Sequence, residues 1–252
     1  MLSKNKIKFI RSLQTKKARD AERCFIAEGD RIVNEIIQSN YKIIEIIALP
    51  DWIDENKIHI KYIPTTAVTK DELQTISNLS TAQRVLAIIQ FQETVLNISE
   101  LSKQLIIGLD KIQDPGNMGT IIRLANWFGI ETIICSQDCV DIYNPKVVQA
   151  TMGAISKVKI YYVDFTQTLK EYATTTNNPI YGTFLDGNNI YTTKVSTAGI
   201  VIFGNEGNGI SKETENVVTS KLTIPSFNKT EVVESLNVSI AASIICSEFR
   251  RR

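Results

Sequence analysis

LIIGLDKIQDPGNMGTIIRLANWFGIETIIC, residues 105–135, is the stretch of the sequence that decides the fold. It opens with the apolar run Leu105–Leu109 and continues into a polar loop at Asp114–Gly119. From Ile121 to Phe128 apolar residues recur at helical spacing. Gly129 follows, and glycine is the residue that most often ends a helix. Ile130–Cys135 is a second apolar run. The stretch therefore predicts a strand, a loop, a helix and a second strand, which is the repeating unit of an α/β domain.

The same alternation continues to the end of the chain. Further strands are expected at Val158–Val163, Ile180–Leu185, Gly199–Phe203 and Leu222–Ile224, with helices starting near Pro145, Thr166, Ser211 and Leu236. Strands and helices that alternate in this way form a mostly parallel sheet covered by helices.

The residues before this region predict a smaller α/β domain. Strands are expected at Phe25–Ala27, Ile43–Ile47, Lys61–Ile63 and Val85–Phe91, and helices over Ile32–Ile37 and after Thr69-x-x-Glu72, which has capping-box spacing. His59, the only histidine, falls in a strand-like run. We expect a basic segment plus this small α/β domain over 1–92, a linker over 93–104 and a larger α/β domain over 105–252.

Composition is that of an ordinary globular protein, with 252 residues, 43% hydrophobic and 22% charged. No apolar run approaches the eighteen or so residues of a membrane span, and no signal sequence is recognised, so we expect a cytoplasmic protein with no membrane association. Four cysteines without a Cys-x-x-Cys pair, together with a single histidine, give no metal site and favour buried free thiols.

The net charge of +1 conceals an uneven distribution. Residues 1–23 hold eight lysines and arginines against two acidic residues, which gives +6, and the chain ends in Arg250-Arg251-Arg252. Such basic segments suit contacts with the phosphates of a nucleic acid. The alternative is a frayed, solubilising terminus.

The run Gly204-Asn205-Glu206-Gly207-Asn208-Gly209 follows an apolar strand and precedes a helix. Its order differs from the dinucleotide fingerprint, and it lacks the Gly-Lys-Ser/Thr of a phosphate loop. Glu206 would repel a pyrophosphate, whereas it is compatible with a cationic ligand or a hydroxyl group. The loop therefore disfavours NAD and ATP, and with them a nicotinamide-dependent oxidoreductase.

Two further segments carry polar side chains at predicted element ends. Asn117 offers an amide, and Arg123 offers a fork for phosphate or is an ordinary surface arginine. Ser235 or Asn237 is a candidate N-cap for the last helix. Because that helix is apolar nearly all round, we expect burial on two sides and a homodimer.

Taken together, Asp114–Arg123, Phe203–Gly209, Ile224-Pro225 and Glu234–Ser239 resemble the three motifs of the SpoU/TrmH family of RNA ribose 2'-O-methyltransferases, in the SPOUT superfamily. The resemblance implies a C-terminal α/β trefoil-knot methyltransferase domain preceded by a small L30e-like α/β substrate-binding domain. It also implies S-adenosyl-L-methionine as cofactor, a homodimer, and an RNA substrate. Of the substrates, 23S ribosomal RNA is favoured over tRNA, and a non-catalytic RNA-binding protein that retains the fold is the alternative.

The resemblance also implies two sets of residues. The catalytic set is Asn117, Arg123, Glu206, Ser235 and Asn237, and the cofactor-binding set is Gly204, Ile224, Pro225 and Leu236. A guanidinium essentially never deprotonates, so we interpret Arg123 as a phosphate clamp and a stabiliser of the developing alkoxide rather than as a general base. The proton acceptor is left unassigned.

Two other segments, Phe25–Gly29 and Asn144–Ala154, are similar to family segments outside the three motifs. The sequence departs from the family pattern at two places. The stretch Pro225–Glu234 is longer than usual and has Asn228 or Lys229 where glycine is common, and Gln83-Arg84 stands where the family has Gln-Gly. From the second change we expect a different contact between the first domain and RNA.

Overall fold

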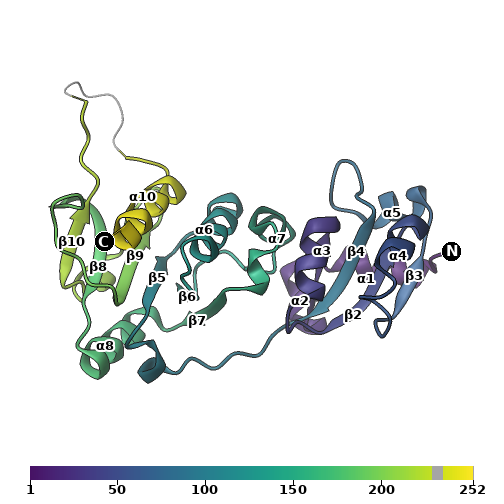
Figure 1. Cartoon of the computed structure of the whole chain (residues 1–252), viewed down its shortest axis with the longest axis horizontal. Helices are drawn as coiled ribbons and strands as arrows, with labels where there is room; N and C mark the ends of the chain where they lie inside the picture. The colour runs from purple at the N-terminus through teal and green to yellow at the C-terminus, as the bar shows by residue number, and fades with distance from the viewer. Residues whose placement is uncertain (229–234, 252) are drawn as a thin grey trace. The chain divides into compact units, whose positions relative to one another are not determined.

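The computed structural model describes residues 1–228 and 235–251. The chain divides into two compact units (Figure 1). One comprises Met1–Glu93 and Asp141–Lys157, and the other comprises Thr94–Val140 and Val158–Arg252. The C-terminal unit, the second of these, contains the elements predicted from residues 105–135.

A six-stranded sheet forms the centre of the C-terminal unit, in the order β10-β8-β9-β5-β6-β7. The strands are β5 (Leu105–Asp110), β6 (Thr132–Ser136), β7 (Lys159–Val163), β8 (Ile180–Asn189), β9 (Gly199–Gly204) and β10 (Ser220–Thr223). The helices are α6 (Pro115–Trp127), α8 (Phe165–Thr176), α9 (Lys212–Glu215) and α10 (Val238–Arg251), with the 3-10 turn η1 (Ile98–Leu101). Every strand pair is parallel, so the predicted parallel sheet is confirmed.

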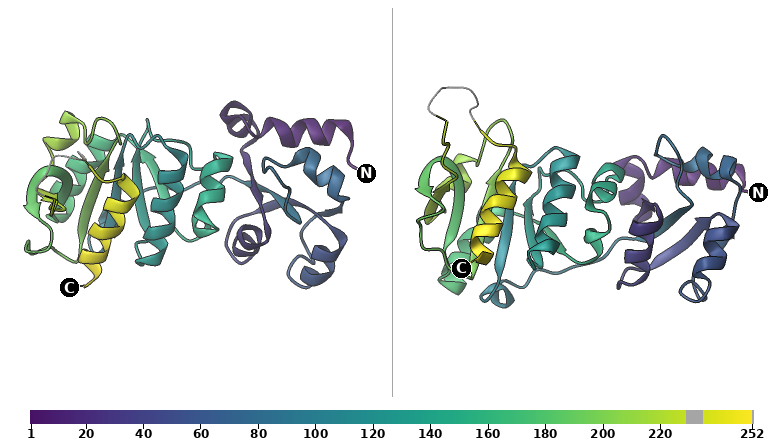
Figure 2. Two further views of the ribbon diagram at one scale, coloured as in Figure 1. Left: turned by 90° about the horizontal axis from the view of Figure 1, so that it is seen from above. Right: turned by 45° about the horizontal axis from the view of Figure 1, so that its top comes forward.

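Helices cover this sheet because its central strands are apolar on both faces. Every residue of β5 and of β6 is buried. Helix α10 packs beside α6 (Figure 2), and α8 contacts β6. Full burial of one isoleucine or leucine side chain stabilises the fold by about 2 kcal/mol, so these strands supply much of the core. The trefoil knot stays a prediction.

The N-terminal unit has a mixed four-stranded sheet in the order β1-β4-β2-β3. Its strands are β1 (Cys24–Glu28), β2 (Ile43–Ala48), β3 (Thr65–Ala67) and β4 (Val85–Gln90). Its helices are α1 (Lys4–Ser12), α2 (Lys16–Glu22), α3 (Asp30–Ile37), α4 (Pro50–Asn56), α5 (Lys70–Ile76) and α7 (Pro145–Thr151), with the 3-10 turn η2 (Ala154–Ser156). The capping box of Thr69 and Glu72 is confirmed at the start of α5.

The strand predicted at Lys61–Ile63 is wrong. These residues form turns after α4, and the strand lies at Thr65–Ala67. Ile58 is 81% exposed and Tyr62 is 87% exposed, so the apolar residues here do not share a buried face. His59 consequently lies in a turn and not in a strand. Alternation over a few residues did not distinguish the two conformations.

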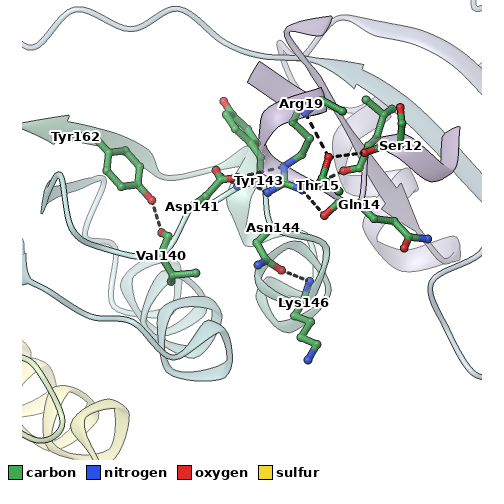
Figure 3. Close-up of polar contacts among 12 residues, drawn as sticks. Ser12, Gln14, Thr15, Arg19, Val140, Asp141, Tyr143, Asn144, Lys146 and Tyr162 are labelled. Carbon is green, nitrogen blue, oxygen red and sulfur yellow. Dashed lines mark hydrogen bonds and ion pairs between the residues drawn. The ribbon is translucent and has the colours of Figure 1, made fainter. Parts of the chain in front are cut away.

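The basic N-terminus is not frayed, because it folds into α1 and α2. Arg19 is 1% exposed and forms an ion pair of 2.5 Å with Asp141 (Figure 3). Its guanidinium also donates to the carbonyl oxygens of Leu13 and Gln14, at 3.0 and 2.8 Å. Arg19 is therefore a structural residue and is removed from the set of possible phosphate contacts.

Other basic residues also have structural roles. Arg250 donates to the carbonyl oxygens of Phe128 and Gly129, at 2.7 and 2.8 Å, and so caps the C-terminal end of α6. Arg84 forms ion pairs with Asp30 at 2.7 Å and Glu55 at 2.9 Å. These carboxylates raise the pKa of the Arg84 guanidinium. Arg84, which stands where the family has glycine, is thus bound by carboxylates of its own unit.

The four cysteines are free and buried, as predicted. Burial raises the pKa of the Cys246 thiol to about 12, and burial next to Glu22 raises that of Cys24 to about 11. Among the described helices, none is long and apolar enough to cross a membrane.

Candidate functional site

Three of the predicted site residues form one hydrogen-bonded chain. Asn237 Nδ2 donates to Asn117 Oδ1 at 3.0 Å, and Asn117 Nδ2 donates to Glu206 Oε1 at 2.9 Å. The two ends of the Asn117 amide are therefore both used, which fixes its orientation. Residues from three segments far apart in the sequence meet at this point, which we call the amide chain.

The start of α6 positions Asn117. The segment predicted as a loop, Asp114–Gly119, is instead largely the first turn of this helix, with Asp114 as its N-cap. The Asp114 side chain accepts a hydrogen bond of 2.7 Å from the Asn117 backbone N–H. Pro115 at the first helical position suits a helix start, because its missing N–H is not needed there. Asn117 thus projects from a capped helix terminus at the carboxyl end of β5.

The glycine-bracketed loop closes on itself. Asn205 and Gly209 exchange two backbone hydrogen bonds of 3.0 and 2.9 Å. A Cβ atom on Gly204 would lie 2.2 Å from the carbonyl carbon of Gly209, so only glycine fits there. Gly209 itself has a φ of 68°. The two glycines are therefore required by the tight turn that presents Glu206.

Asn205 holds this turn to the neighbouring strand. Its Oδ1 accepts hydrogen bonds of 2.9 and 3.1 Å from the backbone N–H groups of Gly207 and Asn208. Its Nδ2 donates to the carbonyl oxygen of Lys111, the residue after β5, at 2.8 Å. Lys111 has a left-handed backbone with a φ of 59°.

A buried carboxylate that the sequence analysis missed fixes the other end of the turn. Asp110 is 2% exposed, and its Oδ2 accepts hydrogen bonds from the Ser211 backbone N–H at 2.8 Å and from Ser211 Oγ at 2.7 Å. Ser211 also caps α9. A carboxylate this deeply buried needs such partners. The sequence feature that could have identified Asp110 is its place as the one charged residue at the end of an apolar strand.

Asn237 has two roles. Its Oδ1 accepts hydrogen bonds from the Ser239 backbone N–H at 2.9 Å and from Ser239 Oγ at 2.7 Å, so Asn237 is the N-cap of α10. Of the two N-cap candidates, Asn237 is thus the one the structure supports. Ser235 is exposed. Glu234, and the part of the Pro225–Glu234 stretch that begins at Lys229, lie outside the described residues.

Arg123 does not join the amide chain. It follows Asn117 by six residues, which in an α-helix is about 9 Å along the axis and about 120° around it. Its side chain is exposed. Within residues 1–228 and 235–251, no carboxylate forms an ion pair with it. A free guanidinium on this helix is available for a ligand outside the subunit.

The predicted cofactor-binding residues follow the ends of parallel strands. Gly204 ends β9, and Ile224 and Pro225 follow β10, so they share the carboxyl edge of one sheet. Leu236, next to Asn237, is 50% exposed. The Glu206 carboxylate, in the loop after β9, gives this edge a negative charge that favours a positively charged ligand such as a sulfonium. The same charge does not fit a polyphosphate.

Comparison with known protein families gives two matches. The model of the SpoU rRNA Methylase family matches residues 104–247. The model of the MRM3-like substrate binding domain matches residues 4–87.

Individual relatives extend over the whole chain. The chain is 27% identical to the 23S rRNA (guanosine(2553)-2'-O)-methyltransferase RlmP of Bacillus subtilis, over 97% of this chain and 96% of the relative. The structure is similar to a putative RNA methyltransferase of the TrmH family from Porphyromonas gingivalis, with 35% identity, a TM-score of 0.86, and 100% and 99% of the two chains covered. It is also similar to an AdoMet-bound rRNA methyltransferase from Sinorhizobium meliloti, with 26% identity, a TM-score of 0.88, and 100% and 97% covered.

Proposed function

The chain belongs to the SpoU rRNA methylase family, and from this premise we propose that it methylates a ribose 2'-hydroxyl of 23S ribosomal RNA. It is an RNA 2'-O-methyltransferase that uses S-adenosyl-L-methionine. The choice of 23S RNA rests on relatives such as RlmP, whose name states that substrate. The small N-terminal unit supports the choice, because it matches a substrate-binding domain.

The observation that carries the proposed site is the amide chain of Asn117, Glu206 and Asn237. Its members are held by a helix cap, a closed glycine turn and a second helix cap. Alignment of the reacting groups accounts for a large part of catalysis in a displacement of this kind. Three independently braced side chains at one strand edge provide such alignment.

S-adenosyl-L-methionine, when bound, supplies a methyl group on a positively charged sulfur. We assign its binding to Gly204, Ile224, Pro225 and Leu236, which present backbone groups and apolar surface at the strand edge. The Glu206 carboxylate gives this region a negative charge that favours a sulfonium over an anionic ligand. Ser235 and Asn237 directly precede α10.

We assign Arg123 to the RNA and not to proton transfer. A guanidinium offers hydrogen-bond donors and no acceptor, so it does not take up the proton of the hydroxyl. Its exposed position suits a contact with a phosphate next to the target ribose, where its charge also stabilises the developing alkoxide. The chain of Asn117, Glu206 and Asn237 then orients the hydroxyl.

We further propose that the protein is a homodimer that works in the cytoplasm, where ribosomal RNA is made in bacteria such as those of its relatives. Trp127 at the end of α6 is 83% exposed, and Ile240 on α10 is 53% exposed. Helices α6 and α10 pack against each other, and each carries one of these side chains. Large exposed apolar side chains are candidate interface residues, which supports a dimer built on this helix pair.

Methyl transfer in vitro tests the function. Labelled S-adenosyl-L-methionine and RNA from cells that lack the gene should give incorporation into the 23S fraction, and nuclease mapping should place the label on a ribose. Incorporation only into tRNA would show that tRNA, and not 23S RNA, is the substrate. Calorimetry that detects no binding of S-adenosyl-L-methionine would favour the non-catalytic RNA-binding protein instead.

A further inference from the structure

The N-terminal unit contains a pocket of about 320 Å³ that the methyl-transfer site does not use. It lies between β1, the turn after α5, and α7. Its walls include the apolar side chains Ile26, Leu79 and Val148. The pocket joins the two sequence segments that resemble the family outside its three motifs, Phe25–Gly29 and Asn144–Ala154.

A buried carboxylate forms part of the pocket wall. Glu28 is only 6% exposed, although it lines the pocket. Its two oxygens accept hydrogen bonds from Ser77 Oγ and, at 2.9 Å, from the Asn78 backbone N–H. Each carboxylate oxygen has two lone pairs, so each retains the capacity for one further bond. The carboxylate is thus ordered by the protein and can still accept hydrogen bonds from a ligand.

Charge and size restrict what the pocket can hold. The Glu28 carboxylate repels a phosphate, which excludes the backbone of a nucleic acid from the interior. The volume is at the lower end of the range for small-molecule sites, about 300–1,000 Å³, and so has room for one base but not for a base pair. The apolar walls are aliphatic side chains, against which a flat base can pack.

A positive group stands at the edge of the same pocket. Lys146 lines it from α7 and is exposed. Figure 3 shows its side chain extending away from the ion pair of Arg19 and Asp141. No carboxylate among the described residues pairs with its Nζ atom. A lysine outside and a carboxylate inside match a nucleotide whose phosphate stays in solvent while its base is inserted.

We propose that this pocket binds one unpaired guanine of the RNA substrate, separate from the nucleotide that is methylated. Guanine carries two adjacent N–H donor groups on its pairing edge, which match the two oxygens of Glu28. Unpaired bases are the usual targets of sequence-specific RNA recognition. Gln149, which also lines the pocket, can bond to the remaining edge. The inference rests on the proposed function for its RNA substrate.

Fluorescence anisotropy with the full chain tests the inference. The probes are a short labelled oligouridine, the same strand with one central guanosine, and the same strand with inosine, which lacks the exocyclic amino group. We expect the guanosine strand to bind on the order of tenfold more tightly than oligouridine, with inosine between them. Equal affinities of the wild-type protein for the guanosine strand and for oligouridine would overturn the proposal.

Two variants test whether the preference for guanosine arises in this pocket. Glu28→Gln keeps the shape of the side chain but only one of its two acceptor oxygens. Ala150→Leu fills the pocket from α7. Each variant should lose the preference for guanosine and still bind oligouridine. Glu22→Gln, which removes a charge from an exposed residue of the same unit, is the control and should keep the preference. Retention of the preference in a folded Ala150→Leu protein would also overturn the proposal. The binding assay contains no S-adenosyl-L-methionine, so a negative result in it does not argue against methyl transfer. A negative result in the methyl-transfer assay likewise does not argue against the guanine pocket.

Discussion

Replacement of Asn237 by aspartate separates the two roles of this side chain. Aspartate caps helices as well as asparagine does, so the hydrogen bonds to Ser239 at the start of α10 should persist. Aspartate has no N–H group, so the bond of 3.0 Å to Asn117 Oδ1 must be lost. The variant Asn237→Asp should therefore fold normally and position Asn117 poorly.

The size of the effect follows from these contacts. Loss of one neutral hydrogen bond costs about 1 kcal/mol, and the new carboxylate faces an oxygen of Asn117 and adds repulsion. We expect a total loss of about 1–3 kcal/mol in transition-state stabilisation, which lowers kcat/KM about 5- to 150-fold. The free energy of unfolding should fall by no more than about 1 kcal/mol, the cost of this one exposed hydrogen bond, because the cap is retained.

Asn237→Ala is the matched control, because it removes the cap as well. It should lose a further 1 kcal/mol or so of stability, which lowers Tm by about 4 °C, and it should also lose activity. The assays are initial rates of methyl transfer and thermal unfolding followed by circular dichroism. Full activity of Asn237→Asp, or activity that falls only in step with stability across the two variants, would refute the reasoning.

Four other predictions address the rest of the structure. Gly204→Ala should abolish cofactor binding in calorimetry, because its Cβ would meet the backbone at 2.2 Å; Gly207→Ala, whose nearest contact is 3.6 Å, should not. Arg19→Met should lower the free energy of unfolding by about 3 kcal/mol in denaturant titrations, because the largely buried carboxylate of Asp141 loses its ion pair. Trp127→Glu should shift the mass measured by light scattering from dimer to monomer. Burial raises the pKa of Cys246 to about 12, so this thiol should be protonated at pH 8 and alkylated slowly until the protein unfolds; fast alkylation of the folded protein would contradict this.

The sequence predicted the parallel sheet well because its signal is local. Runs such as Leu105–Leu109 and Gly199–Phe203 are apolar throughout, as buried parallel strands require, and both are strands of the sheet. The region Lys61–Ile63 was predicted wrongly because a short apolar alternation does not distinguish a strand from turns after a helix.

The site was predicted in part, for a different reason. Asn117, Glu206 and Asn237 were identified from motifs, but their mutual hydrogen bonds join positions remote in the chain and depend on the fold. The roles of Asp110 and Arg19 were missed because each is defined by a distant partner. A single sequence marks a residue type at a position and does not show which distant side chain it meets.

Mapping of ribose methylation in 23S RNA from cells with and without the gene tests the central claim most directly. One 2'-O-methylated nucleotide should disappear on deletion, return with the wild-type gene, and stay absent with the variant Asn117→Ala, whose amide bonds to Glu206 and Asn237 are lost. Unchanged ribose methylation of 23S RNA in the deletion strain, or full restoration by Asn117→Ala, would contradict the account.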